Sequence, residues 1–156
     1  MLATVHNMPS LLIPKELFRE EKIGEYWGIL QPVSQIENIG KDELGDFFLL
    51  YPKPNKEDSN HEIFVLFNQF LRKFPKNEHA ICINVHEDGF SLLVIKERNV
   101  LYTGYFRYIV KEDVLYHLAN ISQHFFEDIN QIVFAYQQIP TAIIRLLENY
   151  YEMKKI

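Results

Sequence analysis

The sequence is poor in residues that define several protein classes. Its single cysteine, Cys82, excludes an internal disulfide and a cysteine-based zinc finger, and it suits a reducing compartment. With only 6 Gly and 7 Pro, collagen-like and low-complexity classes are excluded. No apolar run approaches the roughly 20 residues of a membrane-spanning helix, and residues 1–10 lack the pattern of a signal peptide. We therefore expect a cytoplasmic protein without a membrane partner.

Positive charge is also scarce. The chain has 16 Lys and Arg against 21 Asp and Glu, a net charge of −5, which argues against nucleic acid as the main partner. Hydrophobic residues, by contrast, make up 47% of the chain and aromatic residues 14%. Aromatic side chains at this density build cores and interfaces, so a packed α/β domain is expected.

Hydrophobic periodicity and turn residues predict the elements of the first half. These are a strand at 10–13, a helix at 20–30, a loop at 31–46, a strand at 47–51 and a helix between Ser59 and Pro75. The last of these has a capping-box pattern, in which the Ser59 and Glu62 side chains bind free backbone N–H groups at the helix start.

The second half begins after a boundary at 75–78. Its predicted elements are strands at 80–86, 90–96 and 100–109 with a bulge at Gly104, a helix from Glu112, a strand at 131–136 and a helix from Pro140 that ends near Lys154 and Lys155. The first three strands are close enough to pair as an antiparallel meander, and the fourth should be parallel because a helix precedes it. The order is β-α-β-α and then β-β-β-α-β-α, an α/β protein with a mixed sheet.

Residues along most of the chain resemble an uncharacterised family, found mainly in Bacteroidota, with an actin-like fold. The matching stretches are 12–18, 88–94, 105–108, 111–118 and the strand that ends at Ile139. The element order of the second half is similar to the opening of a ribonuclease H-like lobe, the unit that is duplicated in actin-like ATPases.

This resemblance implies a mixed sheet of the ribonuclease H-like, actin-like ATPase type. Residues 1–75 would be a partial first lobe and residues 76–156 a second lobe. The opening meander of the first lobe would be missing, so the chain would be shortened at its N-terminus, and the last strand and helix of the second lobe could be missing as well. Strands left without neighbours expose sheet edges, which favour self-association or a protein partner.

The resemblance also places a nucleotide site. Actin-like ATPases bind phosphates on hairpins in which a strand-end Asp is followed two residues later by Gly. Here Asn84 stands at the Asp position and His86 at the Gly position, before Asp88-Gly89, and the strand end that would meet adenosine contains Gln137. Asp88-Gly89 is interpreted as an ordinary turn, and binding of ATP with Mg²⁺ through these five residues is the alternative.

Other chemistry finds little support. The sequence has no P-loop, no Gly-x-Ser-x-Gly and no His-Glu-x-x-His motif, so no catalytic residue and no metal ligand is proposed. Tyr102, Tyr105 and Arg107 could form a protein-interaction surface, stack single-stranded nucleic acid, or belong to a sheet packed on both faces.

The sequence therefore predicts a non-catalytic interaction or scaffold module that needs no cofactor and associates with a protein partner or with itself. The alternative is an ATP-binding protein of the actin-like superfamily with an atypical nucleotide site.

Overall fold

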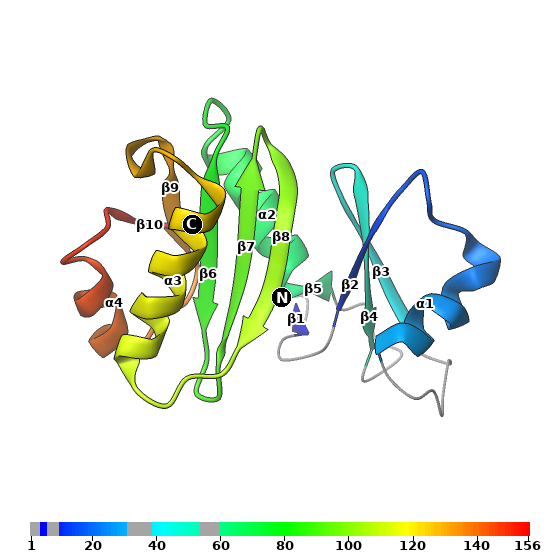
Figure 1. Cartoon of the computed structure of the whole chain (residues 1–156), viewed down its shortest axis with the longest axis horizontal. Coiled ribbons are helices and arrows are strands. Elements are labelled where there is room, and N and C mark those ends of the chain that lie inside the picture. Colours follow the sequence, from blue (N-terminus) through cyan, green and yellow to red (C-terminus); the bar gives the residue numbers. More distant parts are fainter. Residues whose placement is uncertain (1–3, 6–9, 31–38, 54–59) are drawn as a thin grey trace.

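The computed structural model describes residues 4–5, 10–30, 39–53 and 60–156. A five-stranded sheet with helices on both faces lies beside a smaller three-stranded sheet (Figure 1). The first half contains β1 (Thr4–Val5), β2 (Leu11–Pro14), η1 (Glu20–Lys22), α1 (Ile23–Leu30), β3 (Ile39–Leu44), β4 (Phe47–Pro52), β5 (Asn60–His61) and α2 (Glu62–Lys73). The second half contains β6 (Ala80–Val85), β7 (Phe90–Lys96), β8 (Asn99–Phe106), α3 (Lys111–Phe125), η2 (Ile129–Gln131), β9 (Val133–Tyr136), α4 (Thr141–Leu147) and β10 (Met153–Lys155).

The larger sheet has the strand order β10-β9-β6-β7-β8. Strands β6, β7 and β8 pair antiparallel in sequence order, and β9 pairs parallel to β6. The predicted mixed sheet, the meander and the parallel fourth strand are thus confirmed. One irregularity interrupts the meander: Ile95 pairs with Val100 and Val94 with Tyr102, which leaves Leu101 as the extra residue. The bulge is therefore at Leu101, and the prediction of a bulge at Gly104 was wrong.

Alternating side chains of the larger sheet build two separate cores. On one face, Ala80 and Cys82 pack in a cluster with Leu66 and Phe70 of α2, and this cluster extends to Leu49 in the smaller sheet. On the other face, residues of β6 and β7 pack against α3 and α4. Figure 1 shows α2 behind this sheet, with α3 and α4 in front of it. Helix α2 belongs to the first half in sequence but covers the sheet of the second half.

The predicted loop at 31–46 is wrong over residues 39–44, which form β3 and pair antiparallel with β4; residues 31–38 lie outside the described residues. Two features of this stretch explain the error. Its side chains alternate between buried and exposed, as in a strand with one face in the core. Gly40, interpreted as punctuation, lies against the Tyr51 ring so closely that a Cβ atom would be 2.3 Å from a ring carbon.

The predicted C-terminal helix is also too long. Helix α4 ends at Leu147, and residues 153–155 form β10, which pairs parallel to β9 as the outermost strand. Lys154 and Lys155 therefore lie in a strand, and the suggestion that the last strand of this lobe is missing was wrong. The Lys73 ammonium at the end of α2 donates a hydrogen bond to the Lys155 carbonyl at 2.5 Å.

Candidate functional site

Polar side chains gather where β6 and β9 end. Asn84 and His86 lie at the end of β6, and Gln137 and Gln138 follow β9 directly. Because the two strands are parallel, their carboxyl ends lie at the same edge of the sheet. Ligands in open α/β sheets bind at this edge, so it is the place to look for a site.

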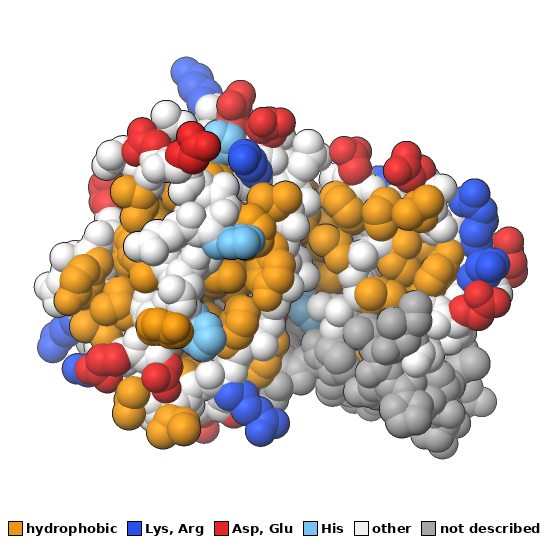
Figure 2. Space-filling model, in the orientation of Figure 1, with side chains coloured by type: hydrophobic (Ala, Val, Ile, Leu, Met, Phe, Trp, Pro, Cys, Tyr) orange, Lys and Arg blue, Asp and Glu red, His pale blue; other side chains and the backbone are white. Residues whose placement is uncertain are grey.

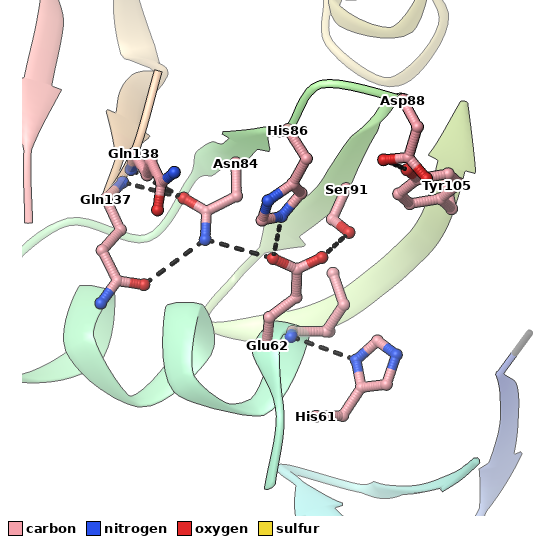
Figure 3. Close-up of polar contacts among 10 residues, drawn as sticks. His61, Glu62, Asn84, His86, Asp88, Ser91, Tyr105, Gln137 and Gln138 are labelled. Atoms are coloured by element: carbon pink, nitrogen blue, oxygen red, sulfur yellow. Dashed lines mark hydrogen bonds and ion pairs between the residues drawn. The ribbon is translucent and has the colours of Figure 1, made fainter. Parts of the chain in front are cut away.

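Glu62 occupies the centre of this group (Figure 3). It is the first residue of α2, and it is 2% exposed. Its Oε2 lies 2.8 Å from Nε2 of His86 and accepts a hydrogen bond from the Asn84 amide at 3.3 Å. Its Oε1 accepts from the Ser91 hydroxyl at the start of β7. Three side chains of the β6–β7 hairpin thus surround one buried carboxylate.

Glu62 was predicted to belong to a capping box with Ser59, and this prediction was wrong for Glu62. Helix α2 begins at Glu62, and its N-cap is His61, whose ring Nδ1 accepts a hydrogen bond from the Ile63 N–H at 3.2 Å. Ser59 lies outside the described residues. With its N-terminus capped by His61, the helix leaves the Glu62 side chain free to reach the hairpin.

Asn84 uses both ends of its amide. The oxygen accepts hydrogen bonds from the backbone N–H groups of Gln137 at 3.2 Å and Gln138 at 3.0 Å. The nitrogen donates to Glu62 and lies 3.4 Å from Oε1 of Gln137. An aspartate at this position could accept the two N–H groups but could not donate to Glu62. The Asn84 amide therefore suits a site in which the negative charge comes from Glu62 of the same chain.

The electrostatics favour an ionised pair. Burial alone raises the pKa of the Glu62 carboxyl, but hydrogen bonds from His86 and Ser91 outweigh burial and hold this pKa below its usual 4.5. The hydrogen bond to Glu62 raises the pKa of His86 above its usual 6.5 despite burial, and the charges of Glu62 and Asp88 add to the rise. The N-terminus of α2 contributes further, because its dipole favours a negative group.

Asp88 and Gly89 form the bend of the hairpin and have other contacts. Asp88 accepts a hydrogen bond from the Tyr105 hydroxyl at 2.7 Å, away from the Glu62 group (Figure 3). A Cβ atom on Gly89 would lie 2.5 Å from the Phe106 carbonyl oxygen, so close packing against β8 requires glycine there. Of the five residues proposed for nucleotide, the structure thus brings Asn84, His86 and Gln137 together around Glu62.

The three residues proposed as an interaction surface do not share one face. The ring of Tyr102 lies 5.6 Å from that of Phe125 on the α3 side of the sheet. Tyr105, three residues along the same strand, points to the other face and binds Asp88, whereas Arg107 is exposed after the strand ends. A continuous stacking platform for bases is therefore not formed by these side chains.

Other kinds of chemistry have few candidates in the part of the chain that the structure describes. There, no group of three or more His, Cys, Asp or Glu side chains is arranged to hold a metal ion. Cys82 is buried, and burial raises the pKa of its thiol, so it is a poor nucleophile. None of the described helices combines the length and the apolar character needed to cross a membrane.

A comparison with protein families identifies the chain. The model of DUF3822, described as a protein of unknown function, matches residues 2–150. The chain belongs to the DUF3822 family. No curated protein matches this DUF3822 chain.

Solved structures support the fold. Six chains of known structure match this DUF3822 protein. One is the crystal structure of a Bacteroides thetaiotaomicron protein with an actin-like ATPase fold and unknown function, which aligns with a TM-score of 0.71 at 13% identity. The alignment covers 94% of this chain and 64% of the Bacteroides chain, so the DUF3822 chain spans under two thirds of the length of that protein. The predicted actin-like fold is confirmed, whereas an origin in Bacteroidota and a shortened N-terminus stay predictions.

Proposed function

We propose that this DUF3822 protein is a non-catalytic interaction or scaffold module on an actin-like fold, with its nucleotide site closed by Glu62. The observation that carries the proposal is the buried Glu62 carboxylate, which takes the hydrogen bonds of Asn84, His86 and Ser91. In the actin-like pattern the positions of Asn84 and His86 belong to a phosphate-binding hairpin. Here their donors are already used by a side chain of the same protein.

Charge makes this closure effective against nucleotides. Two negative charges about 4 Å apart repel by roughly 4 kcal/mol at the effective dielectric constant of about 20 that suits protein sites. A phosphate placed at the end of β6 would meet Glu62, with the Asp88 carboxylate on the same hairpin. A single imidazolium, His86, would have to offset both carboxylates.

Thermal unfolding with Mg-ATP tests the proposal. A ligand at 100 times its dissociation constant adds about 2.7 kcal/mol to the free energy of unfolding, a shift of several degrees. We expect the midpoint of the wild-type protein to stay unchanged up to millimolar Mg-ATP, with Mg²⁺ alone as the control. A saturable rise with ATP, absent with Mg²⁺ alone, would refute the proposal.

That result would favour the alternative, an ATP-binding protein with an atypical site. This alternative is supported by the position of Asn84 and Gln137 at the carboxyl edge of β6 and β9. It predicts that Asn84→Ala abolishes the rise in midpoint, and that Asn120→Ala, an exposed change in α3, leaves the rise intact.

A protein partner or a second copy of the chain would provide the interaction. Among the described strands β8 pairs only with β7, so its outer edge offers unpaired backbone groups. Beyond this strand, large hydrophobic side chains are exposed, including Ile109 at 94% and Tyr116 at 66%. Figure 2 shows hydrophobic side chains at the surface over both parts of the molecule. One chain has a mass of 18.6 kDa, so light scattering should give a larger mass if the chain self-associates. A protein that is monomeric and that captures no partner from its own cell extract would count against this role.

Nucleic acid is a weaker candidate for the partner. Lys and Arg side chains are scattered around the face in Figure 2 and do not gather into one stripe. Binding driven by phosphate contacts would weaken steeply with salt. We expect no binding of single-stranded DNA or RNA at low salt, measured by fluorescence anisotropy.

A further inference from the structure

Two consecutive residues at the start of α2 attach the helix to both sheets. The His61 N–H donates to the Asp42 carboxylate of β3 at 2.9 Å, and Asp42 also has a hydrogen bond with the Tyr51 hydroxyl. Next along the chain, Glu62 binds the β6–β7 hairpin through His86 and its neighbours. The first turn of α2 therefore lies between a polar contact to the smaller sheet and a polar contact to the larger one.

The contact to the larger sheet depends on a titratable pair. His86 faces Glu62 of α2 and Asp88 of its own hairpin, and its carbonyl accepts a hydrogen bond from the Tyr108 hydroxyl at 2.7 Å. Glu62 in turn faces Ser91 of β7, and its charge also reaches Tyr105 of β8. Asn84 of β6 and Gln137 after β9 complete the surroundings, and both are neutral amides. The cation that contacts Glu62 in this group of described residues is protonated His86, and the charge of Arg107 acts on Tyr105.

We propose that Glu62 and His86 form a pH-sensitive latch that holds the first turn of α2 against the β6–β7 hairpin. The latch is closed by a charge-assisted hydrogen bond between Oε2 and Nε2. When His86 loses its proton, a neutral imidazole can still donate through Nε2 to the carboxylate, but the attraction between the two opposite charges is lost. Glu62 then remains as a buried carboxylate without a counter-charge, and the first turn opens more often.

The direction of the effect follows from linkage. The pKa of His86 is raised in the folded protein, so its stabilisation is complete below the usual 6.5 and is lost as the pH rises through the raised value. The pKa of Glu62 is lowered, so its contribution is present above the usual 4.5 and is lost as the pH falls through the lowered value. The latch is therefore strongest in mildly acidic solution and weakens as the solution becomes alkaline.

Amide hydrogen exchange measures the latch directly. In the wild type, protection in the first turn of α2, corrected for intrinsic exchange, should fall between pH 6 and pH 9, by about tenfold for each unit by which the pKa of His86 is raised. His86→Gln keeps a side chain that can donate and should remove this pH dependence, whereas His124→Gln, a change of an exposed histidine in α3, should keep it. The same fall in protection in His86→Gln would overturn the latch.

A second measurement needs no variant. An NMR titration of the His86 ring in the wild-type protein should give a pKa above 6.5, and a value at or below 6.5 would also overturn the latch. The latch rests on the proposed function in one respect: both take Glu62 as the group that occupies the site at the ends of β6 and β9. Binding of Mg-ATP would refute the proposed function and leave these two readouts unchanged, so the two failures can be told apart.

Discussion

At the scale of single residues, Asn84 explains how the site is built. Its amide joins the end of β6 to the backbone that follows β9, and it donates to Glu62 at the same time. Only a side chain with both an acceptor and a donor can make this set of contacts. The identity of residue 84 is therefore tied to the presence of the carboxylate at residue 62.

Asn84→Asp should destabilise the protein strongly. The change is nearly isosteric, but it places a second buried carboxylate next to the first, where the Asn84 amide nitrogen now lies 3.3 Å from Glu62 Oε2. The repulsion at that distance is worth roughly 5 kcal/mol at an effective dielectric constant of about 20. The loss should shrink as the pH falls, because protonation of either carboxyl removes the repulsion. Urea unfolding at pH 5 and pH 8 measures this, with exposed Asn120→Asp as the matched control; equal losses at both pH values would contradict the argument.

Glu62→Ala should cost roughly 3–5 kcal/mol, the usual effect of removing one partner from a buried ion pair. The change removes the carboxylate that Asn84, His86 and Ser91 contact and opens a space of carboxylate size. Acetate or formate should fill that space and raise the unfolding midpoint of the variant in a saturable way. Chloride at equal ionic strength should not raise the midpoint of the variant. If acetate, formate and chloride all have the same effect, a free carboxylate does not replace the Glu62 side chain.

Sequence reasoning reached part of this site. Asn84, His86 and Gln137 were found because the resemblance assigns strand-end positions to ligand binding. Glu62 was missed because Ser59 and Glu62 have the spacing of a capping box. A signal was nevertheless present: position 62 precedes Leu66 and Phe70 by four and eight residues, so Glu62 lies on the apolar stripe of the helix. A charged residue on such a stripe predicts a buried partner.

At the scale of elements, the turn between β7 and β8 has an unusual composition. Lys96 pairs with Asn99, so the loop consists of Glu97 and Arg98 alone, with φ values of 52° and 62°. Positive φ at both positions is the geometry of a type I′ turn, which favours Asn and Gly. Arg98 offsets the strain, because its guanidinium donates to the Pro75 carbonyl at 3.0 Å and the Asn77 carbonyl at 3.1 Å.

Glu97→Asn should therefore stabilise the protein by about 0.5–1 kcal/mol, since asparagine adopts positive φ more readily. Arg98→Asn makes the same conformational gain but loses the hydrogen bonds to the carbonyl groups that follow α2, and it should lower stability. Chemical denaturation of the two variants provides the test. A gain in both variants would mean that the Arg98 contacts contribute little.

The elements that sequence reasoning missed are short and polar. Strand β3 reads Ile-Gly-Lys-Asp-Glu-Leu, and its charged residues and glycine are typical of loops. Strand β10 has only three residues, two of them lysines that also suit a helix end. Both owe their conformation to pairing with a more apolar neighbour, β4 or β9, and this dependence is invisible in local propensity. The long apolar strands and the strongly periodic α2 were predicted because their own patterns suffice.

At the scale of the whole molecule, the actin-like fold was predicted from the resemblance of residue stretches and of element order to a known family, and it is confirmed by the structural match. A fold of this type hosts many functions, so it constrains the chemistry less than the site does. The division into lobes at 75–78 stays a prediction. What the structure adds is the way in which the two halves share one core, with Leu49 and Phe70 from the first half packed in the same cluster as Cys82 and Leu93 from the second.

Because the two halves share this core, residues 1–75 and residues 76–156 should not be stable when they are expressed separately. A polypeptide of residues 76–156 expressed by itself would carry Cys82, Leu93 and Ile95 on a bare face with no helix to shield them, and it should aggregate. Co-expression with residues 1–75 should restore solubility by reassembly of the two pieces, as judged by co-purification through a tag on one of them. If the 76–156 piece is soluble and well folded by itself, α2 is not needed to shield this face of the larger sheet.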